Sequence, residues 1–164
     1  IIFKLNPSYG IPDLNKIIKD LAGDRVDVPE IKVDLGIYEL KDLNKMYNES
    51  DVFISATRAE AFNLPCAEAL ACNKMVITTG YGGQCDFVKD GVNGFYIGYE
   101  MTENNWEIQY ENISWATPYI PDLRKRLRWC YENKDKVNEI NKKCNESIKG
   151  ISWDSTAQKL VSLE

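Results

Sequence analysis

Two kinds of apolar pattern alternate along the chain. Short, mainly apolar runs, which are typical of buried strands, occur at 1–5, 31–35, 51–55, 75–78 and 95–97. Apolar residues spaced three or four positions apart predict helices at 13–22, 40–47, 64–73, 121–130, 134–148 and 153–163, with a short helix at 85–89. Strands that alternate with helices predict the α/β class: a Rossmann-like parallel sheet with helices on both faces.

Two segments differ from this pattern. Residues 99–118 are acidic, aromatic and rich in Asn without a regular period, which predicts a long loop or a lid. The second segment is the basic run at 124–128, which contains Arg124, Lys125, Arg126 and Arg128. Because this run lies on a predicted helix of an acidic chain, it favours a solvated helix face over a nucleic-acid contact.

Composition excludes several classes of chemistry. The chain has 164 residues, enough for one domain, and contains no His, which excludes Ser-His-Asp and Cys-His nucleophile systems. No two Asp residues lie two positions apart, so the sequence has no D-x-D metal clamp. A formal net charge of -5 argues against nucleic acid as a partner, because a nucleic-acid footprint needs a basic surface.

The five Cys residues are scattered and form no C-x-x-C pair. They predict free thiols in a reducing compartment, hence a cytoplasmic location, with peripheral membrane attachment of the intact protein left open. No apolar run approaches the roughly 20 residues of a membrane span. The first residue is not Met and already has the pattern of a strand, so we expect that further chain precedes it.

The segment 55–70 carries the candidate chemistry: the end of a strand, a loop and a helix. Asn63 is a natural N-cap for the helix, and Pro65 suits its first turn. The first backbone N–H groups of the helix, such as those of Leu64 and Cys66, have no partners inside it. Together with the helix dipole they predict an anion site, at the carboxyl end of a strand where ligands bind to parallel sheets.

Two carboxylates flank this turn. Glu60 precedes the helix, where it could accept hydrogen bonds from sugar hydroxyls. Glu68 lies about one turn inside the helix and could bind two vicinal hydroxyls of a ribose bidentately, since both oxygens of a carboxylate accept. The alternative for Glu68 is a first-turn residue that the helix dipole alone favours.

A second Gly-rich turn, 80–86, follows the next strand. Gly82 and Gly83 allow the backbone to approach a ligand closely, and another helix N-terminus follows them. Ordinary turn chemistry is the alternative for this pair, but two such turns at consecutive strand ends favour a binding site.

These segments, in this order, resemble the retaining glycosyltransferases of family 4, which have the two-domain GT-B fold. Glu60 and Glu68 resemble the two acidic residues of the family's E-x7-E motif. Residues 75–79 resemble its PVIAT strand, 82–95 its GG..E/D.V.DG.NG stretch and 151–154 its late fsW motif. The resemblance is good over 31–98 and loose over 120–164.

The resemblance implies the C-terminal half of a GT-B enzyme, which holds a nucleotide-sugar donor while a hexose is transferred to an acceptor with retention at the anomeric carbon. By this analogy Glu60 is catalytic and contacts the donor hexose, Glu68 holds the ribose, and no metal or other cofactor is required. The other donor-binding residues implied are Phe62, Asn63 and Leu64 near the sugar and phosphates, Gly36 and Ile37 near the base, and Gly82 and Gly83 in a loop whose contacts are unassigned.

The family's phosphate-holding Arg/Lys pair and its acceptor-binding N-terminal domain are not found in this sequence. We therefore expect 1–164 to be one partial domain, inactive alone, whose partners are the donor and an N-terminal domain upstream in the same chain. Asn63 and Asn73 replace residues that are commonly Gly in the family, and Asn73 tolerates the same left-handed conformation. A catalytically degenerate binding or scaffold module is the alternative; an epimerase or phosphorylase of the same fold is a third, weaker hypothesis. The base, hexose and acceptor stay open.

Overall fold

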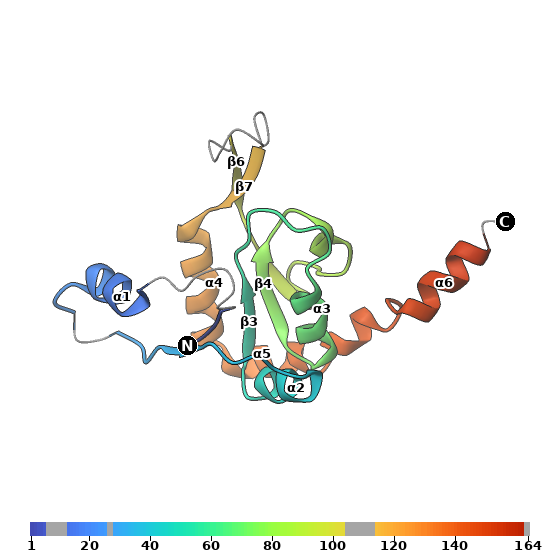
Figure 1. Cartoon of the computed structure of the whole chain (residues 1–164), viewed down its shortest axis with the longest axis horizontal. Helices are drawn as coiled ribbons and strands as arrows, with labels where there is room; N and C mark the ends of the chain where they lie inside the picture. The colour runs from blue at the N-terminus through green and yellow to red at the C-terminus, as the bar shows by residue number, and fades with distance from the viewer. Residues whose placement is uncertain (6–12, 26–27, 104–113, 163–164) are drawn as a thin grey trace. The chain divides into compact units, whose positions relative to one another are not determined.

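The computed structural model describes residues 1–5, 13–25, 28–103 and 114–162 (Figure 1). It divides into two compact units, Ile1–Leu43 and Asn44–Glu164. The first unit contains β1 (Ile2–Lys4), α1 (Leu14–Ala22) and β2 (Lys32–Asp34), with β1 and β2 paired in parallel. α2 (Leu40–Asn48) contains the boundary between the units.

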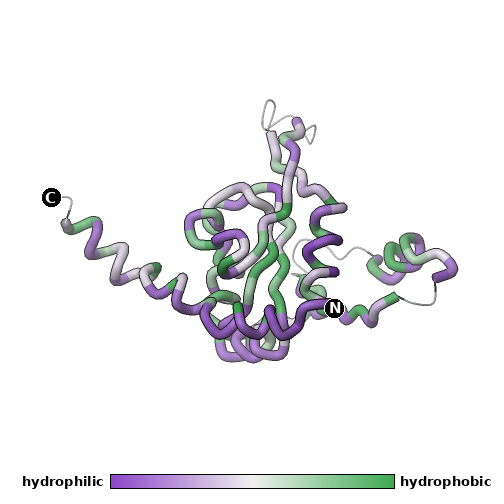
Figure 2. Tube along the Cα trace, turned by 180° about the vertical axis from the view of Figure 1, so that it is seen from behind, coloured by the Kyte–Doolittle hydropathy of each residue, from purple (hydrophilic) through white to green (hydrophobic). Residues whose placement is uncertain are grey.

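The second unit is built on a parallel sheet with the order β3-β4-β5. Its strands are β3 (Val52–Ser55), β4 (Met75–Thr79) and β5 (Gly94–Ile97). Every residue of the central strand β4 is buried, which requires cover on both faces because side chains alternate along a strand. Figure 2 shows this sheet as the apolar centre of the unit. The α/β class with parallel strands is therefore confirmed.

Two helices cover opposite faces of this sheet (Figure 1). Phe95 is paired in register with Ile77, and its ring makes an edge contact with Trp129 of α4 (Ile120–Glu132), with 4.9 Å between ring centroids. The next residue, Thr78, faces the other side and contacts the Cys66 thiol on α3 (Leu64–Ala71). The Cβ alternation of β4 thus distributes its side chains between α4 and α3.

The C-terminal region is more broken than predicted. The helix predicted at 134–148 is α5 (Lys134–Asn141) followed by a separate 3-10 helix, η4 (Cys144–Ile148). The last helix, α6 (Trp153–Val161), starts at a Ser152 capping box and contains no buried residue. None of the helices in the described ranges combines the length and the apolar character that crossing a bilayer requires.

The prediction of a loop at 99–118 is wrong for its described parts. β6 (Tyr99–Glu103) and β7 (Ser114–Pro118) form an antiparallel pair, and residues 104–113 lie outside the described ranges. The hydroxyl oxygens of Thr102 and Thr117 lie 2.7 Å apart across the pair. These strands escaped detection because most of their residues are partly exposed, so they form no continuous apolar run.

The basic run on α4 is a solvated face with one exception. Arg126 is half-buried, and its guanidinium lies 4.8 Å from the centroid of the Phe95 ring. It also pairs with Asp122 at 3.7 Å and Asp90 at 3.9 Å between nitrogen and oxygen atoms. Arg126 therefore secures β5 to α4, a packing role that the charge pattern did not reveal.

All five cysteines are free thiols, as predicted. Three of them are buried: Cys66, Cys130 and Cys144. Burial raises the pKa of the Cys66 and Cys144 thiols to about 12 and that of Cys130 to about 11. These three thiols therefore stay protonated near neutral pH and pack as small apolar groups.

Asn93 is the polar centre of the turn before β5, and we expect its loss to destabilise the fold. It is 2% exposed; its amide donates to Phe87 O (2.9 Å) and Ser147 Oγ (2.8 Å), and its Oδ1 accepts from Lys89 N (2.7 Å). Asn93→Ala should lower the free energy of unfolding in urea by about 2–3 kcal/mol, because buried partners lose their hydrogen bonds. The control Asn138→Ala, at an exposed position of α5, should change it by less than about 0.5 kcal/mol. Equal losses in the two variants would contradict this role of Asn93.

Candidate functional site

The loop at 56–63 leaves the carboxyl end of β3 and leads into α3. Because β3 and β4 are parallel neighbours, the turn at 80–83 after β4 lies at the same edge of the sheet. The two connections contact each other directly: the backbone N–H of Gly83 donates to the carbonyl oxygen of Glu60 at 3.3 Å. The predicted pair of turns at consecutive strand ends is therefore one continuous structure.

This contact depends on glycine. A Cβ on Gly83 would lie 1.9 Å from the carbonyl oxygen of Ala61, and a Cβ on Gly82 would lie 2.8 Å from that of Glu60. Gly82 also has φ of 100°, a backbone conformation that L side chains rarely adopt. Gly82 and Gly83 thus allow the turn to pack on the backbone of the Glu60 loop.

A buried glutamine fixes the Gly-rich turn from inside. Gln84 is fully buried, and its Nε2 donates to Thr79 O (3.1 Å) and Tyr81 O (2.6 Å). The turn continues into a single 3-10 turn, η2 (Gly83–Asp86). The short helix expected at 85–89 is thus a 3-10 turn that begins two residues earlier and ends three residues earlier. A single 3-10 turn is too short to bind an anion through a helix dipole, as the second helix N-terminus was expected to do.

Asn63 does not cap α3 through its side chain, in contrast to the prediction. The residue is at the N-cap position but has the left-handed conformation, with φ of 67° and ψ of 63°. It is 4% exposed, and its Nδ2 donates to Ser55 Oγ at 3.0 Å. Asn suits a left-handed position better than most residues with a Cβ, so it can replace a glycine here. Asn73 has the expected left-handed conformation, with φ of 57°.

Three consecutive backbone N–H groups at the start of α3 donate to no atom of the described residues: those of Phe62, Asn63 and Leu64. The N–H of Cys66 does have a partner, the carbonyl oxygen of Asn63 at 3.0 Å, which corrects its expected role. Leu64 is 59% exposed, so this end of the helix is open to solvent. The free N–H groups and the helix dipole make it electropositive.

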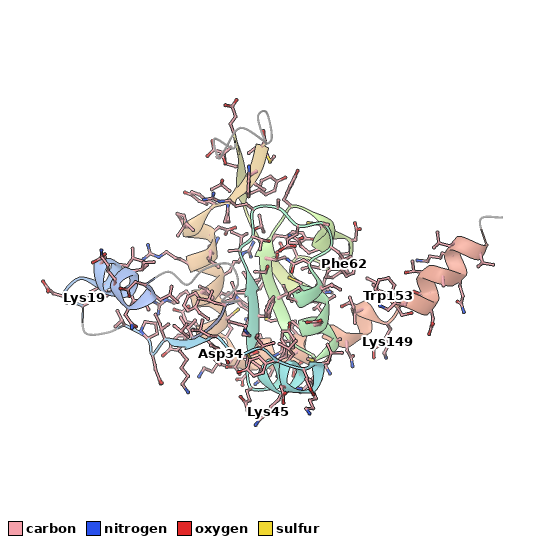
Figure 3. The ribbon with its side chains drawn as sticks, viewed as in Figure 1. Lys19, Asp34, Lys45, Phe62, Lys149 and Trp153 are labelled. Atoms are coloured by element: carbon pink, nitrogen blue, oxygen red, sulfur yellow. The ribbon has the colours of Figure 1, made fainter. Side chains whose placement is uncertain are left out.

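The Phe62 side chain supports the loop. Its ring lies 5.0 Å from that of Phe87 between centroids, and Figure 3 shows it near the N-terminal end of α3. This contact joins the loop to the residue that follows η2. The described contact of Phe62 is thus with the protein, while its backbone N–H remains free.

The two candidate carboxylates occupy different surroundings. Glu60 is half-buried, and its side-chain carboxylate makes no hydrogen bond or ion pair among the described residues. Burial is the main cause of the raised pKa of Cys66, and the negative charge of Glu60 adds to it, so Glu60 lies near the first turn of α3. Glu68 is also half-buried, and its Oε2 accepts from the Tyr47 hydroxyl at 2.9 Å. Neither carboxylate is neutralised by a described ion pair, so both can accept hydrogen bonds from a ligand.

Gly36 and Ile37 belong to the unit Ile1–Leu43, whereas all other candidate residues belong to the unit Asn44–Glu164. Gly36 N donates to Asp34 Oδ1 at 2.9 Å, and a Cβ on Gly36 would lie 2.8 Å from the Tyr38 ring. Ile37 is 91% exposed. In the second unit, the structure brings Glu60, Phe62, Asn63, Leu64, Gly82 and Gly83 together at one edge of the sheet.

Sequence patterns missed two residues that support this site, Tyr47 and Gln84. Tyr47 is the last residue of the helix predicted at 40–47, and a buried tyrosine needs a partner for its hydroxyl, which was the available signal. Gln84 follows two glycines and gave no signal of burial. In the described residues, no group of three or more Cys, Asp and Glu side chains could hold a metal ion.

Residues 29–117, more than half of the chain, match the family described as glycosyl transferases group 1. The chain belongs to this family. An uncharacterized glycosyltransferase of Methanocaldococcus jannaschii is 25% identical over 154 residues, which cover 94% of this chain and 35% of the relative. Spore coat protein SA of Bacillus subtilis is 23% identical over 156 residues, which cover 94% of this chain and 37% of the relative. The chain thus spans about a third of the length of these relatives.

Solved structures share the fold. A glycosyltransferase from Rickettsia africae aligns over 99% of this chain and 38% of its own, with a TM-score of 0.69 and 19% identity. Anabaena HepE, solved in complex with UDP-glucose, aligns over 99% of this chain and 40% of its own, with a TM-score of 0.66 and 20% identity. At this identity the likeness shows the fold alone, and the α/β fold expected from the resemblance is confirmed.

Gly83→Ala should disrupt the contact between the two turns. The added Cβ would overlap the carbonyl oxygen of Ala61, so the backbone must move. We expect a loss of about 1–3 kcal/mol in the free energy of unfolding, measured in urea, and faster proteolysis within 56–63. The control Gly150→Ala places a Cβ with nothing within 4 Å and should leave both measurements unchanged. An unaltered Gly83→Ala protein would contradict the close approach.

Proposed function

We propose that this chain is the donor-binding domain of a retaining, metal-independent glycosyltransferase of family 4, which transfers a hexose from a nucleotide-sugar to an acceptor. The observation that carries this proposal is the loop of Glu60, with its free backbone N–H groups, packed on the Gly82–Gly83 turn at the carboxyl ends of neighbouring strands. A parallel sheet binds ligands at this edge, and free N–H groups at a helix start favour phosphate.

Each group has a separate task in this mechanism. Glu60 accepts hydrogen bonds from the donor hexose and orients its anomeric carbon toward the acceptor. Glu68 accepts hydrogen bonds from the two vicinal hydroxyls of the ribose. The N–H groups of Phe62, Asn63 and Leu64 face the phosphates, where negative charge develops as the nucleoside diphosphate departs. The bond from the anomeric carbon to the phosphate oxygen breaks, and the acceptor hydroxyl oxygen bonds to that carbon on the same face. The hydroxyl proton of the acceptor passes to the departing phosphate oxygen.

The family and its relatives support this proposal. The chain belongs to a glycosyltransferase family, and a structural neighbour, HepE, is solved with UDP-glucose. A matching relative over 112 residues at 25% identity is a sucrose synthase of Acidithiobacillus caldus. UDP-glucose is therefore the first donor to test. In the proposed protein, an N-terminal domain binds the acceptor, and this chain alone turns over little substrate.

A donor screen tests the nucleotide-sugar assignment. The full-length protein should show a higher melting temperature with UDP-glucose than without it, since a ligand that binds only the folded state stabilises it. GDP-glucose and ADP-glucose in parallel measure base preference. The absence of a shift with all three donors at about 5 mM, which is several times the roughly 1 mM upper end of enzyme KM values, would contradict donor binding. Binding with no hydrolysis or transfer would favour the catalytically degenerate binding module.

Substitution of the two carboxylates should separate turnover from binding. Glu68→Ala should raise the donor Kd roughly 10-fold to 100-fold, because it removes charge-assisted hydrogen bonds. Glu60→Ala should lower kcat about 100-fold with a smaller change in Kd, because its contacts act at the reacting sugar. The control Glu132→Ala, at an exposed position on α4, should leave both constants unchanged. Unchanged kinetics in Glu60→Ala would overturn its catalytic assignment.

A further inference from the structure

A buried tyrosine joins the helix before β3 to the candidate ribose carboxylate. Tyr47 on α2 donates its hydroxyl proton to Oε2 of Glu68 on α3, with 2.9 Å between the oxygens. Tyr47 is 8% exposed, so it has little surface with which to contact a ligand itself. Any effect of its hydroxyl on a ligand must therefore pass through Glu68.

The position of the Tyr47 hydroxyl is fixed by packing. The Tyr47 ring makes an edge contact with Phe53 on β3, with 5.7 Å between centroids and 65° between planes. Its backbone carbonyl accepts from Ser50 N (3.1 Å) and Ser50 Oγ (2.8 Å) at the end of α2. Side chain and backbone are thus both held, and the hydroxyl is a fixed point from which Glu68 can be oriented.

The Tyr47 hydroxyl remains protonated and so remains a hydrogen-bond donor. Burial, followed by the hydrogen bond to Glu68 and the charge of that carboxylate, holds the pKa of Tyr47 well above its ordinary value. The hydroxyl therefore keeps its proton throughout the neutral range. It has one proton, and that proton goes to Oε2, which leaves Oε1 of Glu68 without a hydrogen bond among the described residues.

We propose that Tyr47 is a positioning residue for nucleotide recognition: its hydrogen bond holds the Glu68 carboxylate so that the remaining acceptor sites face the vicinal hydroxyls of the donor ribose. This inference rests on the proposed function, because it takes Glu68 to be the ribose-binding group. Without the Tyr47 hydroxyl, the Glu68 carboxylate keeps its charge but samples other rotamers. The nucleotide must then immobilise the Glu68 side chain when it binds, and this entropic cost weakens binding.

The test compares UDP with 2′-deoxy-UDP, which differ by one hydroxyl of the ribose. Kd is measured calorimetrically on the full-length protein. The unsubstituted protein should prefer UDP, and Tyr47→Phe should weaken UDP binding about fivefold to tenfold while it changes 2′-deoxy-UDP binding much less. The preference for UDP therefore falls. If Tyr47 served only to pack two helices, Tyr47→Phe would weaken the binding of UDP and of 2′-deoxy-UDP equally, and that result would overturn the proposal.

A double variant shows whether Tyr47 acts through Glu68. In a Glu68→Ala background, Tyr47→Phe should cause no further change in the Kd of UDP, because the group that it positions is absent. Additive losses would overturn the proposal. The matched control is Tyr131→Phe, which removes the hydroxyl of a tyrosine that is 69% exposed on α4 and should leave both Kd values unchanged.

Two variants of Glu68 separate a failure of the Tyr47 proposal from a failure of the proposed function. Glu68→Asp keeps the charge and Tyr47 but withdraws the carboxylate by one methylene, so it should reduce the UDP preference as Tyr47→Phe does. Loss of the preference in Glu68→Ala but not in Tyr47→Phe would overturn the role of Tyr47 and leave the proposed function intact. Equal binding of UDP and 2′-deoxy-UDP by the unsubstituted protein, unaffected by Glu68→Ala, would overturn the ribose role of Glu68 itself.

Discussion

The close approach of two backbone segments, the Gly82–Gly83 turn and the Glu60–Ala61 loop, is the constraint on which the candidate site depends. The carbonyl oxygens of the loop occupy the space that side chains at Gly82 and Gly83 would fill. Because no side chain intervenes, the Gly83 N–H reaches the Glu60 carbonyl, and the loop is held by the sheet edge. A loop held in this way presents its remaining N–H groups at a defined place, which preorganises them for an anion.

Polar side chains of the sheet complete this support. Thr79 Oγ1 donates to the carbonyl oxygen of Thr57 at 2.6 Å, and Thr78 Oγ1 donates to that of Ser55 at 3.0 Å. On the other side of the loop, Ala116 N of β7 donates to the Arg58 carbonyl oxygen at 3.0 Å. The antiparallel pair of β6 and β7 is therefore attached to the loop that carries Glu60. The backbone of the loop is fixed at several points while the Glu60 side chain keeps its acceptors free.

Sequence alone predicts a candidate site on the loop between β3 and α3, but it does not determine the geometry of that loop. The strand, loop and helix around Glu60 follow from local signals: an apolar run, a proline in the first turn and a helical period. The conformation of Asn63 does not, because an N-cap side chain and a left-handed backbone are both compatible with Asn at that position. The free N–H of Phe62 and the bonded N–H of Cys66 also depend on the actual course of the chain.

Residue order alone determined the strands and helices that have a clear apolar period, the parallel α/β class, the free thiols and the two acidic positions eight residues apart, since apolar period and turn residues are local properties. The tertiary structure decided which of these meet in space. The hydroxyl of Tyr47 reaches a carboxylate 21 positions away, Arg126 stacks on a ring from another element, and β6 pairs with β7 although neither has a strong apolar pattern. Such contacts join residues distant in sequence, and their partners are fixed only when the sheet and its helices have packed.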